Sequence, residues 1–502
     1  DELHDALLTI GFLTEAEGRA MDFEPLVRTK RATFLSGAWI AAERLPELLA
    51  IHPQLEPAIA APPSRQKEWT REAALIEMIR GRMTMVGPTT AAALAQSLRV
   101  EERDVDAALV ALESEGVILR GTFETRSSLE WCDRRLLARI HRYTIHRLRA
   151  EIEPVSAADF MRFLFVWQHV AQPAKLRGLD GLQAVVAQLD GFEVAASGWE
   201  RSVLPVRIDG YEPALLDMLC LTGEVGWARL SPATSTVVSA TPIALFLRAN
   251  ADAWQLLRGE STIELSDAAR TALETLRTRG ASFARDLGDD DAIGELVSAG
   301  LIASDGFAGL RALVNGAHEK HRANLAGRWS LLSPRGETTD DDAIEIQARA
   351  LLRRYGVIFR RLLTREPNAA PWRELARVYR RLEARGEIRG GRFVRGMSGE
   401  QFALPDAIER LREIRRDHAD GRLLVISAAD PLNLTGILDE EERIRAVAGT
   451  RIAYRDGIAV SVMEGDSVRP LVDLDAMNAM TVATALAGRR VAASSGWVGR
   501  SA

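Results

Sequence analysis

Apolar positions recur along the chain in a short unit in which an amphipathic helix ends at a glycine. The unit reads L-x-x-x-G-x-[IV] and occurs at Leu112–Ile118, Leu219–Val225, Leu296–Ile302 and Leu382–Ile388. A helix that stops at glycine and continues into a β-hairpin is typical of a winged helix, which presents a recognition helix and a wing. One copy is weak evidence, because many helices end in this way. Four copies predict an array of winged-helix modules.

Two further stretches show the alternation of short β-strands. Ala32–Leu35 and Trp39–Ala42 flank Ser36-Gly37, so the opening segment is expected to hold the second half of a winged helix. After residue 422 three strands are predicted, at Leu423–Ser427, Arg451–Tyr454 and Ile458–Val462, and a hairpin turn at 455–457 joins the last two. These strands indicate a small β-barrel or sheet that caps the array, and the barrel is the fold predicted here.

The pattern therefore predicts a multi-domain fold that is mainly α with small β elements: tandem winged-helix modules followed by a C-terminal β-barrel. The predicted domains are a partial winged helix (1–60), a winged helix (64–130), a winged-helix-like module with inserted helices (131–258), a winged helix (259–335), a basic winged helix (340–415) and the β-barrel (416–502).

Composition places the chain among globular proteins. Its 502 residues are 47% hydrophobic and 27% charged, and no apolar run approaches the roughly 18 residues of a membrane span. Cys132 and Cys220 are the two cysteines, without a C-x-x-C pair, which indicates a reducing, cytoplasmic compartment. Because the sequence begins at Asp1 without a leader, we expect it to be a piece of a longer protein.

Charge is segregated although the net charge is −6. Acidic residues gather at 289–291 and 340–342, whereas arginines gather between Arg353 and Arg395, and only Lys30, Lys67, Lys175 and Lys320 are lysines. A GC-rich genome, which favours arginine codons everywhere, is one explanation of this bias. Bidentate binding of phosphate by guanidinium groups is the alternative, and the local clustering favours it between Arg353 and Arg395.

The helix before Gly386 carries the clearest basic stripe. Arg377, Arg381 and Arg385 are four residues apart, so they share one helix face, which Glu374 and Glu383 only partly balance. The helix before Gly116 is acidic instead and is expected to contact protein. The residues predicted to bind DNA in this region are Arg377, Arg380, Arg381, Arg385, Arg389 and Arg392.

Two polar clusters are candidates for chemistry. Trp167, Gln168 and His169 follow an apolar helix, where they either pack and satisfy backbone groups or stack on and hydrogen-bond to a nucleic-acid strand. Asp430 begins D-P-L-N-L, which is either a turn between strands or an active-site carboxylate able to activate water or stabilise an oxocarbenium ion. Gln168 and Asp430 are therefore the catalytic candidates, and Trp167 and His169 are DNA-binding candidates.

Other chemistry lacks its motifs. No G-x-x-x-x-G-K-[ST] loop is present, so this piece is not expected to hydrolyse a nucleotide or to hold a cofactor. No H-E-x-x-H or G-x-S-x-G occurs, and the eight histidines lack metal-ligand spacing. No metal site is predicted.

Five strings resemble the C-terminal region of the large helicase-related proteins, which are bacterial superfamily 2 DNA helicases. They are Glu130–Arg142, Glu151–Val170, Trp199–Tyr211, Leu219–Trp227 and Asp430–Gly436. W-Q-H-V at 167–170 and D-P-L-N-L-T-G at 430–436 are the distinctive ones. The resemblance implies a parent protein that is an ATP-dependent 3′-to-5′ DNA repair helicase, with ATP and Mg²⁺ bound in a motor core that this piece lacks.

The resemblance also implies tandem winged helices plus a β-barrel, self-assembly as a tetramer, and similarity to glycosylases that unhook interstrand crosslinks. Those glycosylases use a glutamine–apolar–acid-or-glutamine motif, and Gln168-His169-Val170 departs from it at the third position. Uracil glycosylase activity in the family is attributed to an aspartate near the C-terminus. The last acidic residue here, Asp475, lies in a different context, so that role is not transferred.

Three functional hypotheses follow. The first is the DNA-binding and oligomerising region of a cytoplasmic, nucleoid-associated repair helicase, whose partners are single-stranded or duplex and tailed DNA, a second copy of itself and the helicase core, with no membrane. The second is a DNA glycosylase that acts on flipped uracil or crosslinked bases. The third is a structural hub in which arginine helices meet acidic loops of neighbouring subunits.

Overall fold

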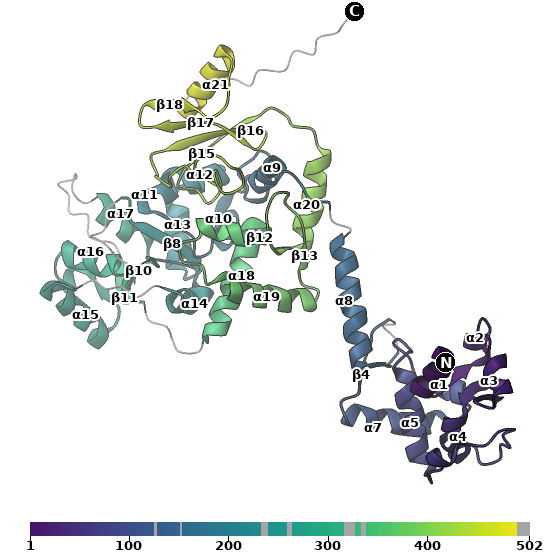
Figure 1. The fold of residues 1–502 in the computed structure, drawn as a ribbon. Coiled ribbons are helices and arrows are strands. Elements are labelled where there is room, and N and C mark those ends of the chain that lie inside the picture. Colours follow the sequence, from purple (N-terminus) through teal and green to yellow (C-terminus); the bar gives the residue numbers. More distant parts are fainter. Residues whose placement is uncertain are drawn as a thin grey trace, which may run out of the picture. The chain divides into compact units, whose positions relative to one another are not determined.

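The computed structural model describes residues 1–124, 128–150, 153–231, 239–258, 264–315, 327–332 and 338–488, with the side chains of 145–150 and 315 excepted. Two compact units, Asp1–Leu148 and Arg149–Ala502, divide the chain (Figure 1). Both contain copies of one recurring module, which in its complete form has a helix, a strand, two helices and two strands.

The first unit holds two such modules. The first consists of α1 (Glu2–Ile10), β1 (Leu13–Thr14), α2 (Glu15–Gly18), α3 (Glu24–Arg28), β2 (Ala32–Leu35) and β3 (Ala38–Ala41). The turn η1 (Ala42–Arg44), α4 (Leu45–Ile51) and η2 (Pro63–Arg65) follow. The second consists of α5 (Arg71–Met83), α6 (Ala91–Leu98), α7 (Glu102–Ser114), β4 (Ile118–Gly121) and β5 (Glu130–Asp133), and α8 (Arg134–Ala150) comes after it. The predicted hairpin at 32–41 is confirmed, and it is preceded by three helices of its own.

The second unit opens with α9 (Ala157–Trp167) and contains three modules in chain order. The first has α10 (Gly178–Gln188), β6 (Glu193–Ala195), the helical run α11 (Ala196–Gly198), η3 (Trp199–Val203) and α12 (Leu204–Arg207), then α13 (Pro213–Leu221), β7 (Val225–Ala228) and β8 (Pro242–Leu247). The turn η4 (Arg248–Asn250) and α14 (Ala251–Leu256) link it to the second. That module has α15 (Asp267–Arg279), β9 (Ser282–Phe283), η5 (Ala284–Asp286), α16 (Asp290–Ser298), β10 (Ile302–Ser304), α17 (Phe307–Asn315) and β11 (Arg328–Leu331).

The third module of this unit consists of α18 (Asp340–Tyr355), β12 (Val357–Phe359), η6 (Arg360–Arg365), α19 (Trp372–Ala384), β13 (Arg389–Gly391) and β14 (Gln401–Ala403), and α20 (Pro405–Arg416) follows. In every complete three-stranded sheet of these modules the first strand pairs with the third, and the third pairs with the second, as in β12-β14-β13. In the α5–β5 module a single bridge from Thr89 to Trp131 takes the place of the first strand. This order of helices and strands is that of a winged helix.

The recurring glycines end the third helix of four modules, as the sequence predicted. Gly116, Gly223, Gly300 and Gly386 have φ angles of 72°, 81°, 67° and 76°, the left-handed region that favours glycine. In each copy the N–H after the glycine donates to the carbonyl of the leucine, as from Val117 to Leu112 at 3.0 Å. The leucine and the isoleucine or valine two positions after the glycine are both buried. The motif is therefore a helix stop of the Schellman type whose apolar ends both enter the core.

A fifth copy of the same stop closes α3, although its sequence breaks the pattern. Lys30 has a φ of 57°, and the N–H of Arg31 donates to the carbonyl of Leu26 at 2.8 Å. Leu26 and Ala32 are buried at the two apolar positions. A lysine replaces the glycine here and an alanine replaces the isoleucine or valine, so the sequence motif did not reveal this module.

The predicted C-terminal β-barrel is wrong. The four strands β15 (Leu423–Ser427), β16 (Arg451–Arg455), β17 (Ile458–Glu464) and β18 (Ser467–Pro470) form an open antiparallel sheet in that order, and the described residues contain no closed barrel. The last strand is an exposed edge that ends at Pro470, which has no N–H to donate. Residues 489–502 of the predicted barrel domain lie outside the described residues.

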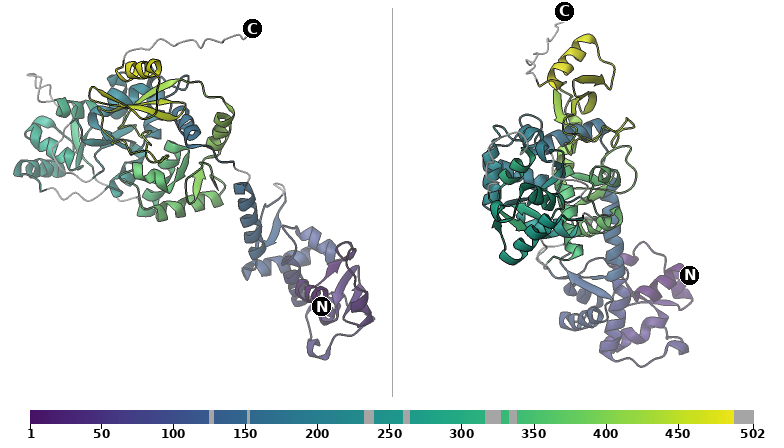
Figure 2. Two further views of the ribbon diagram at one scale, coloured as in Figure 1. Left: turned by 45° about the horizontal axis from the view of Figure 1, so that its top comes forward. Right: turned by 90° about the vertical axis from the view of Figure 1, so that its left-hand side faces the viewer.

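This sheet stays open because helices cover both of its faces. On one face Ala453 and Val460 pack against Val482 and Leu486 of α21 (Ala476–Leu486). Figure 2 shows this helix, in yellow, lying along one face of the sheet. On the other face Tyr454 meets Phe165 of α9, with ring centroids 5.2 Å apart. The apolar residues on both sides of β16 are thus buried without closure of the sheet.

The glycine stop is testable by substitution. Gly116→Ala should lower the free energy of unfolding by about 1–2 kcal/mol, because an L-residue is strained at positive φ, and an added Cβ meets no atom within 4 Å that would add a clash. Chemical denaturation measures the change. Gly87→Ala is the matched control in the same unit, since Gly87 has open space and no positive φ. Equal effects of the two substitutions would contradict the interpretation.

Candidate nucleic-acid interface and the buried junction behind it

The third helix of the last module, α19, is amphipathic in a way that leaves a basic face outside. Leu375, Tyr379 and Leu382 are fully buried, and the Tyr379 hydroxyl donates to the carbonyl of Ala348 in α18 at 3.2 Å. Burial raises the pKa of Tyr379, so it remains a neutral packing residue. The opposite face carries the exposed arginines of the helix, at positions 373, 377, 380 and 381.

The equivalent helices of the other modules are not basic. The helix α7 carries four acidic residues and one arginine, and α16 carries three acidic residues and no basic one. The helix α13 contains Asp217 as its only charged residue, and α3 has one glutamate and one arginine. Among the described recognition helices, α19 therefore offers the most positive surface to a polyanion.

The helix α13 is also partly covered by its own neighbours. Asp217 accepts hydrogen bonds from the backbone N–H of Ala308 in α17 at 2.8 Å and from Arg311 at 3.0 Å. Arg311 also binds Glu200 at 2.6 Å, and these two carboxylates outweigh the effect of burial and raise the pKa of its guanidinium. The α13 face is thus engaged with protein groups, which leaves α19 as the candidate for DNA.

The predicted DNA-binding arginines fall into two groups. Arg380, Arg381 and Arg385 pair with Glu400, Glu345 and Glu387 at 2.5, 2.9 and 3.7 Å. In the part of the chain that the structure describes, no ion pair involves the exposed side chains of Arg377, Arg389 and Arg392. The second group has its full charge available for a ligand.

The wing after β13 is held in shape by one buried side chain. The Gln401 Oε1 atom accepts from the N–H groups of Phe393 and Val394, both at 2.8 Å. Its amide Nε2 donates to the carbonyls of Val394 at 3.0 Å and Met397 at 3.2 Å. The wing backbone also pairs with Val155, whose N–H donates to the Phe393 carbonyl at 2.8 Å. Arg392 therefore projects from an ordered loop.

The structure adds basic residues that the sequence reading missed. Arg412 and Arg416, exposed on α20, line a small cavity of about 110 Å³ together with Phe393 of the wing. No ion pair is recorded for either of them within the described residues. The sequence contained a signal for this basic face. Residues 405–416 read P-D-A-I-E-R-L-R-E-I-R-R, which is typical of an amphipathic helix with basic residues one turn apart.

Trp167 and His169 contact protein groups. The Trp167 indole N–H donates to the carbonyl of Arg353 at 2.9 Å, and its ring stacks on Phe163 with centroids 5.3 Å apart. His169 has a φ of 63°, and its Nδ1 lies 2.9 Å from the Ala174 carbonyl. Burial lowers the pKa of this imidazole. Both side chains are only half-buried, and their role in DNA binding stays a prediction.

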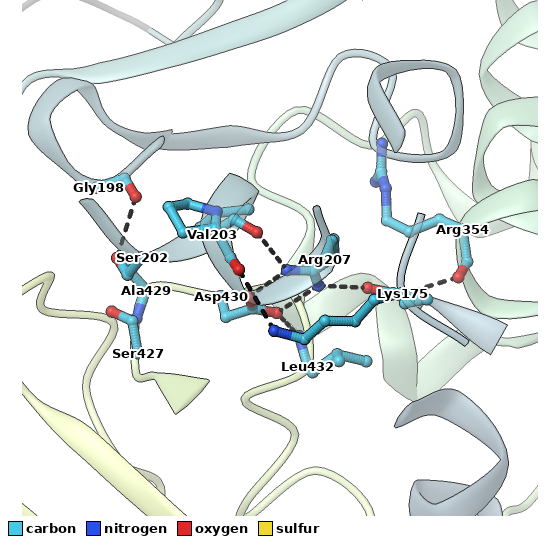
Figure 3. A network of polar contacts seen from close by, with 12 residues as sticks. Lys175, Gly198, Ser202, Val203, Arg207, Arg354, Ser427, Ala429, Asp430 and Leu432 are labelled. Atoms are coloured by element: carbon cyan, nitrogen blue, oxygen red, sulfur yellow. Dashed lines mark hydrogen bonds and ion pairs between the residues drawn. The ribbon is translucent and has the colours of Figure 1, made fainter. Parts of the chain in front are cut away.

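The two catalytic candidates meet at one buried arginine. Arg207, at the end of α12, donates from its two terminal nitrogens to Asp430 at 2.7 and 2.8 Å (Figure 3). It also donates to Gln168 Oε1 at 2.8 Å. Arg207 and Gln168 are 0% exposed, and Asp430 is 1% exposed. The backbone N–H of Leu432 donates to the same carboxylate at 3.0 Å. We refer to Gln168, Arg207 and Asp430 as the buried junction.

The buried junction continues into the last module. The Gln168 amide donates to the carbonyl of Arg354 at 2.9 Å, and the Arg354 guanidinium binds Glu366 at 2.5 Å and the Asp190 carbonyl at 2.7 Å. Burial opposes the charge of Arg354, but the carboxylate of Glu366 outweighs it and raises the pKa. The chain of contacts joins α9, α12 and α18 to the loop after β15.

A second arginine supports this loop from the other side. Arg365 donates to the backbone carbonyls of Ala429 and Asp430 at 2.7 and 2.9 Å. Burial lowers the pKa of Arg365, and the neighbouring Tyr355 and Glu366 act against that shift. Asp430 is therefore enclosed by protein groups that satisfy both its carboxylate and its carbonyl. This geometry gives Gln168 and Asp430 a structural task, and their catalytic role stays a prediction.

The described residues offer little other chemistry. No group of three or more metal-binding side chains occurs there. Cys132 and Cys220 are both free and buried, and burial raises the pKa of the Cys220 thiol to about 12. None of the described helices combines the length and the hydropathy needed to cross a bilayer.

Winged-helix modules in tandem, one of them with a basic recognition helix, define the class as a multi-module winged-helix protein. Residues 155–248 and 337–423 each match a family described as "Large helicase-related protein, winged-helix domain", the third and fourth such domains of that protein. The chain therefore carries winged-helix domains of the large helicase-related family. The resemblance seen in the sequence is confirmed.

Two curated relatives extend the match. The chain is 31% identical over 426 residues to the "Lhr helicase/ probable uracil glycosylase" of Mycolicibacterium smegmatis, covering 75% of this chain and 28% of the relative. It is 29% identical over 374 residues to the "Lhr helicase/uracil glycosylase" of Escherichia coli, covering 61% and 24%. The chain thus spans about a quarter of the length of these relatives.

One solved structure is distantly similar. It is the Streptomyces sahachiroi DNA glycosylase AlkZ, with 13% sequence identity and a TM-score of 0.40. The match covers 67% of this chain and 98% of that one.

The buried junction should stabilise the second unit. Arg207→Met should lower the free energy of unfolding by about 3–5 kcal/mol, because it leaves the Asp430 carboxylate buried without its counter-charge. Asp430→Asn should also destabilise, and the double variant should lose less than the sum of the two single effects. Denaturant unfolding of the four proteins measures this coupling.

Arg270→Met is the control for removal of an arginine. Arg270 is 59% exposed in its side chain and pairs with Asp267 on α15, so its loss should leave the unfolding midpoint nearly unchanged. A midpoint for Arg207→Met that matches this control would refute the structural task of the junction.

Proposed function

We propose that this chain is a DNA-binding region of a repair helicase of the large helicase-related type, and that α19 with its wing holds the DNA. The observation that carries the proposal is that α19 is the basic member of a set of equivalent helices. Its Arg377, together with Arg389 and Arg392 of the wing region, is exposed and has no acidic partner among the described residues. The names of the two relatives, both helicases, supply the context.

DNA is bound mainly through phosphates in this proposal. Guanidinium groups match phosphate oxygens bidentately, and each neutralised phosphate releases counterions, so binding weakens as salt rises. The exposed arginines of α19 and the wing lie on one module whose backbone is fixed by Gln401. Little ordering of the wing is needed on binding, which preserves affinity. No base-specific contact is proposed, so single-stranded, duplex and tailed DNA are all ligands.

The proposal extends to the longer protein. ATP and Mg²⁺ belong to a motor core outside this chain, and the length of the relatives leaves ample room for one. Self-assembly is also proposed. The helix α21 exposes Met477 and Met480, at 76% and 69%, which are unusually accessible apolar side chains for a contact between copies.

Charge removal on the proposed surface tests the function. Arg377→Gln, Arg389→Gln and Arg392→Gln together should weaken DNA binding about tenfold or more at low salt. They should also make the slope of log K against log salt shallower by about two to three, since each lost phosphate contact removes about 0.7–0.9. Fluorescence anisotropy with single-stranded and tailed oligonucleotides over a salt series measures both quantities.

The matched control is a triple variant on α15, which is the first helix of its module. Arg270→Gln, Arg277→Gln and Arg279→Gln remove the same charge from exposed positions. Equal losses in the two triple variants would mean that net charge matters and α19 does not. Absence of any salt-sensitive DNA binding by the intact chain would reject the proposal in favour of a structural hub.

A second candidate function is uracil excision, which the names of both relatives favour. With uracil-containing DNA followed by alkali, the intact chain should then produce strand breaks. If Asp430 acts on the sugar, Asp430→Asn should abolish the breaks, whereas Arg207→Met, which disturbs the same junction but removes neither candidate, should keep them at a temperature where both variants are folded. Circular dichroism under the assay conditions verifies folding.

If Asp430→Asn and Arg207→Met both lose strand breaks, and each loses them in proportion to the fall in its unfolding midpoint, Asp430 has only a structural role. Gln168→Ala distinguishes the other candidate in the same assay. If the intact chain produces no strand breaks in uracil-containing DNA, the proposal that this chain excises uracil is rejected.

A further inference from the structure

The helix α8 carries a concentration of positive charge that the proposed α19 surface does not use. It spans Arg134–Ala150 and contains six arginines and two histidines but no aspartate or glutamate. Exposed residues fill the stretch from 138 to 144, including Tyr143 at 69% exposure and Ile140 at 37%. A surface helix normally mixes charges of both signs, so this composition requires an explanation.

The basic residues form one stripe. Arg135, Arg139 and Arg142 are spaced by four and three residues, which places them on one face of a helix with 3.6 residues per turn. In the sequence, positions 146 and 149 continue the same spacing with a histidine and an arginine. All three described arginines of the stripe are exposed.

The described part of the chain supplies no counter-charge to this stripe. Among the described residues no ion pair involves Arg135, Arg139 or Arg142. The nearest acid in the sequence, Asp133, is used as a cap: its carboxylate accepts from the N–H groups of Arg135 and Leu136, both at 2.8 Å. The stripe is therefore available to a ligand.

The charges act against the helix that carries them. Like charges three and four residues apart repel by roughly 0.2–0.5 kcal/mol per pair, and cations in the first turn oppose the helix dipole. Leu136 is the one described side chain of α8 that is buried, so packing recovers little of this cost. A polyanion bound along the stripe would attract each of these arginines and so offset the repulsion between them.

We propose that α8 is a second nucleic-acid contact, at which the Arg135–Arg139–Arg142 stripe binds the sugar–phosphate backbone of DNA. At a rise of 1.5 Å per residue the stripe is about 10 Å long, a distance over which one DNA strand carries about three phosphates. Tyr143 lies beside the stripe and offers a ring for a base of a single strand. This inference stands on α8 alone and does not require α19 to bind.

The experiment compares two triple variants of the whole chain. Arg135→Gln, Arg139→Gln and Arg142→Gln keep the helix propensity close to that of arginine and remove the stripe. The control removes three arginines of the same unit that have acidic neighbours: Arg71 with Asp104 at 2.7 Å, Arg103 with Asp104 at 3.7 Å, and Arg120 with Glu113 at 3.0 Å. Anisotropy with a single-stranded oligonucleotide and a duplex is measured over a salt series.

The stripe variant should bind about tenfold or more weakly at low salt and lose about two to three units of salt slope, whereas the control should lose less than one. Tyr143→Ala should weaken single-strand binding more than duplex binding. Unchanged DNA affinity and slope in the stripe variant would overturn the inference. A change in oligomeric state without a change in DNA binding would also overturn it, and would identify an acidic protein surface as the ligand.

Running the α19 triple variant beside the α8 variant separates the two surfaces. Loss of binding in the α8 variant alone would reject the α19 proposal and retain this one, and the reverse result would do the opposite. Loss in both, with salt slopes that add, would place DNA on both surfaces.

Discussion

The second unit depends on the pairing of Arg207 with Asp430. A guanidinium and a carboxylate that are fully withdrawn from water are costly unless their hydrogen-bonding atoms are matched. Here the two terminal nitrogens of Arg207 meet the two carboxylate oxygens of Asp430, and Gln168 and the backbone N–H of Leu432 add two further hydrogen bonds, while Arg207 Nε has no partner among the described residues. Through Gln168 and Arg354 the same contacts reach the module that carries α19. The proposed DNA surface is therefore anchored to the neighbouring module and to the C-terminal sheet.

The local features of the fold were readable from the sequence. The glycine stop depends on only a few consecutive residues, so Leu112, Gly116 and Ile118 predict it without information from the rest of the chain. The Asp456-Gly457 hairpin is equally local, and both residues have the positive φ that such a turn requires. The basic stripe of α19 was visible for the same reason, because helical spacing and charge are both properties of a short window.

Long-range partners were not readable. Gln168 and Asp430 stood out as polar residues in apolar strings, but a buried structural pair and a catalytic pair have that appearance in common. What distinguishes them is Arg207, which lies 223 residues before Asp430 and carries no local mark of its task. The barrel failed for a similar reason: apolar residues on both faces of β16 indicate burial, and only the positions of α9 and α21 reveal that helices provide it.

The span of the Arg207–Asp430 pair bears on how such a protein can evolve. Arrays of repeats commonly grow and shrink by duplication or loss of single repeats, because each repeat contacts only its neighbours. Two complete winged-helix modules lie between the partners of this pair in the chain, so an exchange that replaces everything on one side of an internal boundary would leave one of the two buried charges without its partner. The second unit is therefore expected to be inherited as one block, with recombination breakpoints confined to its ends.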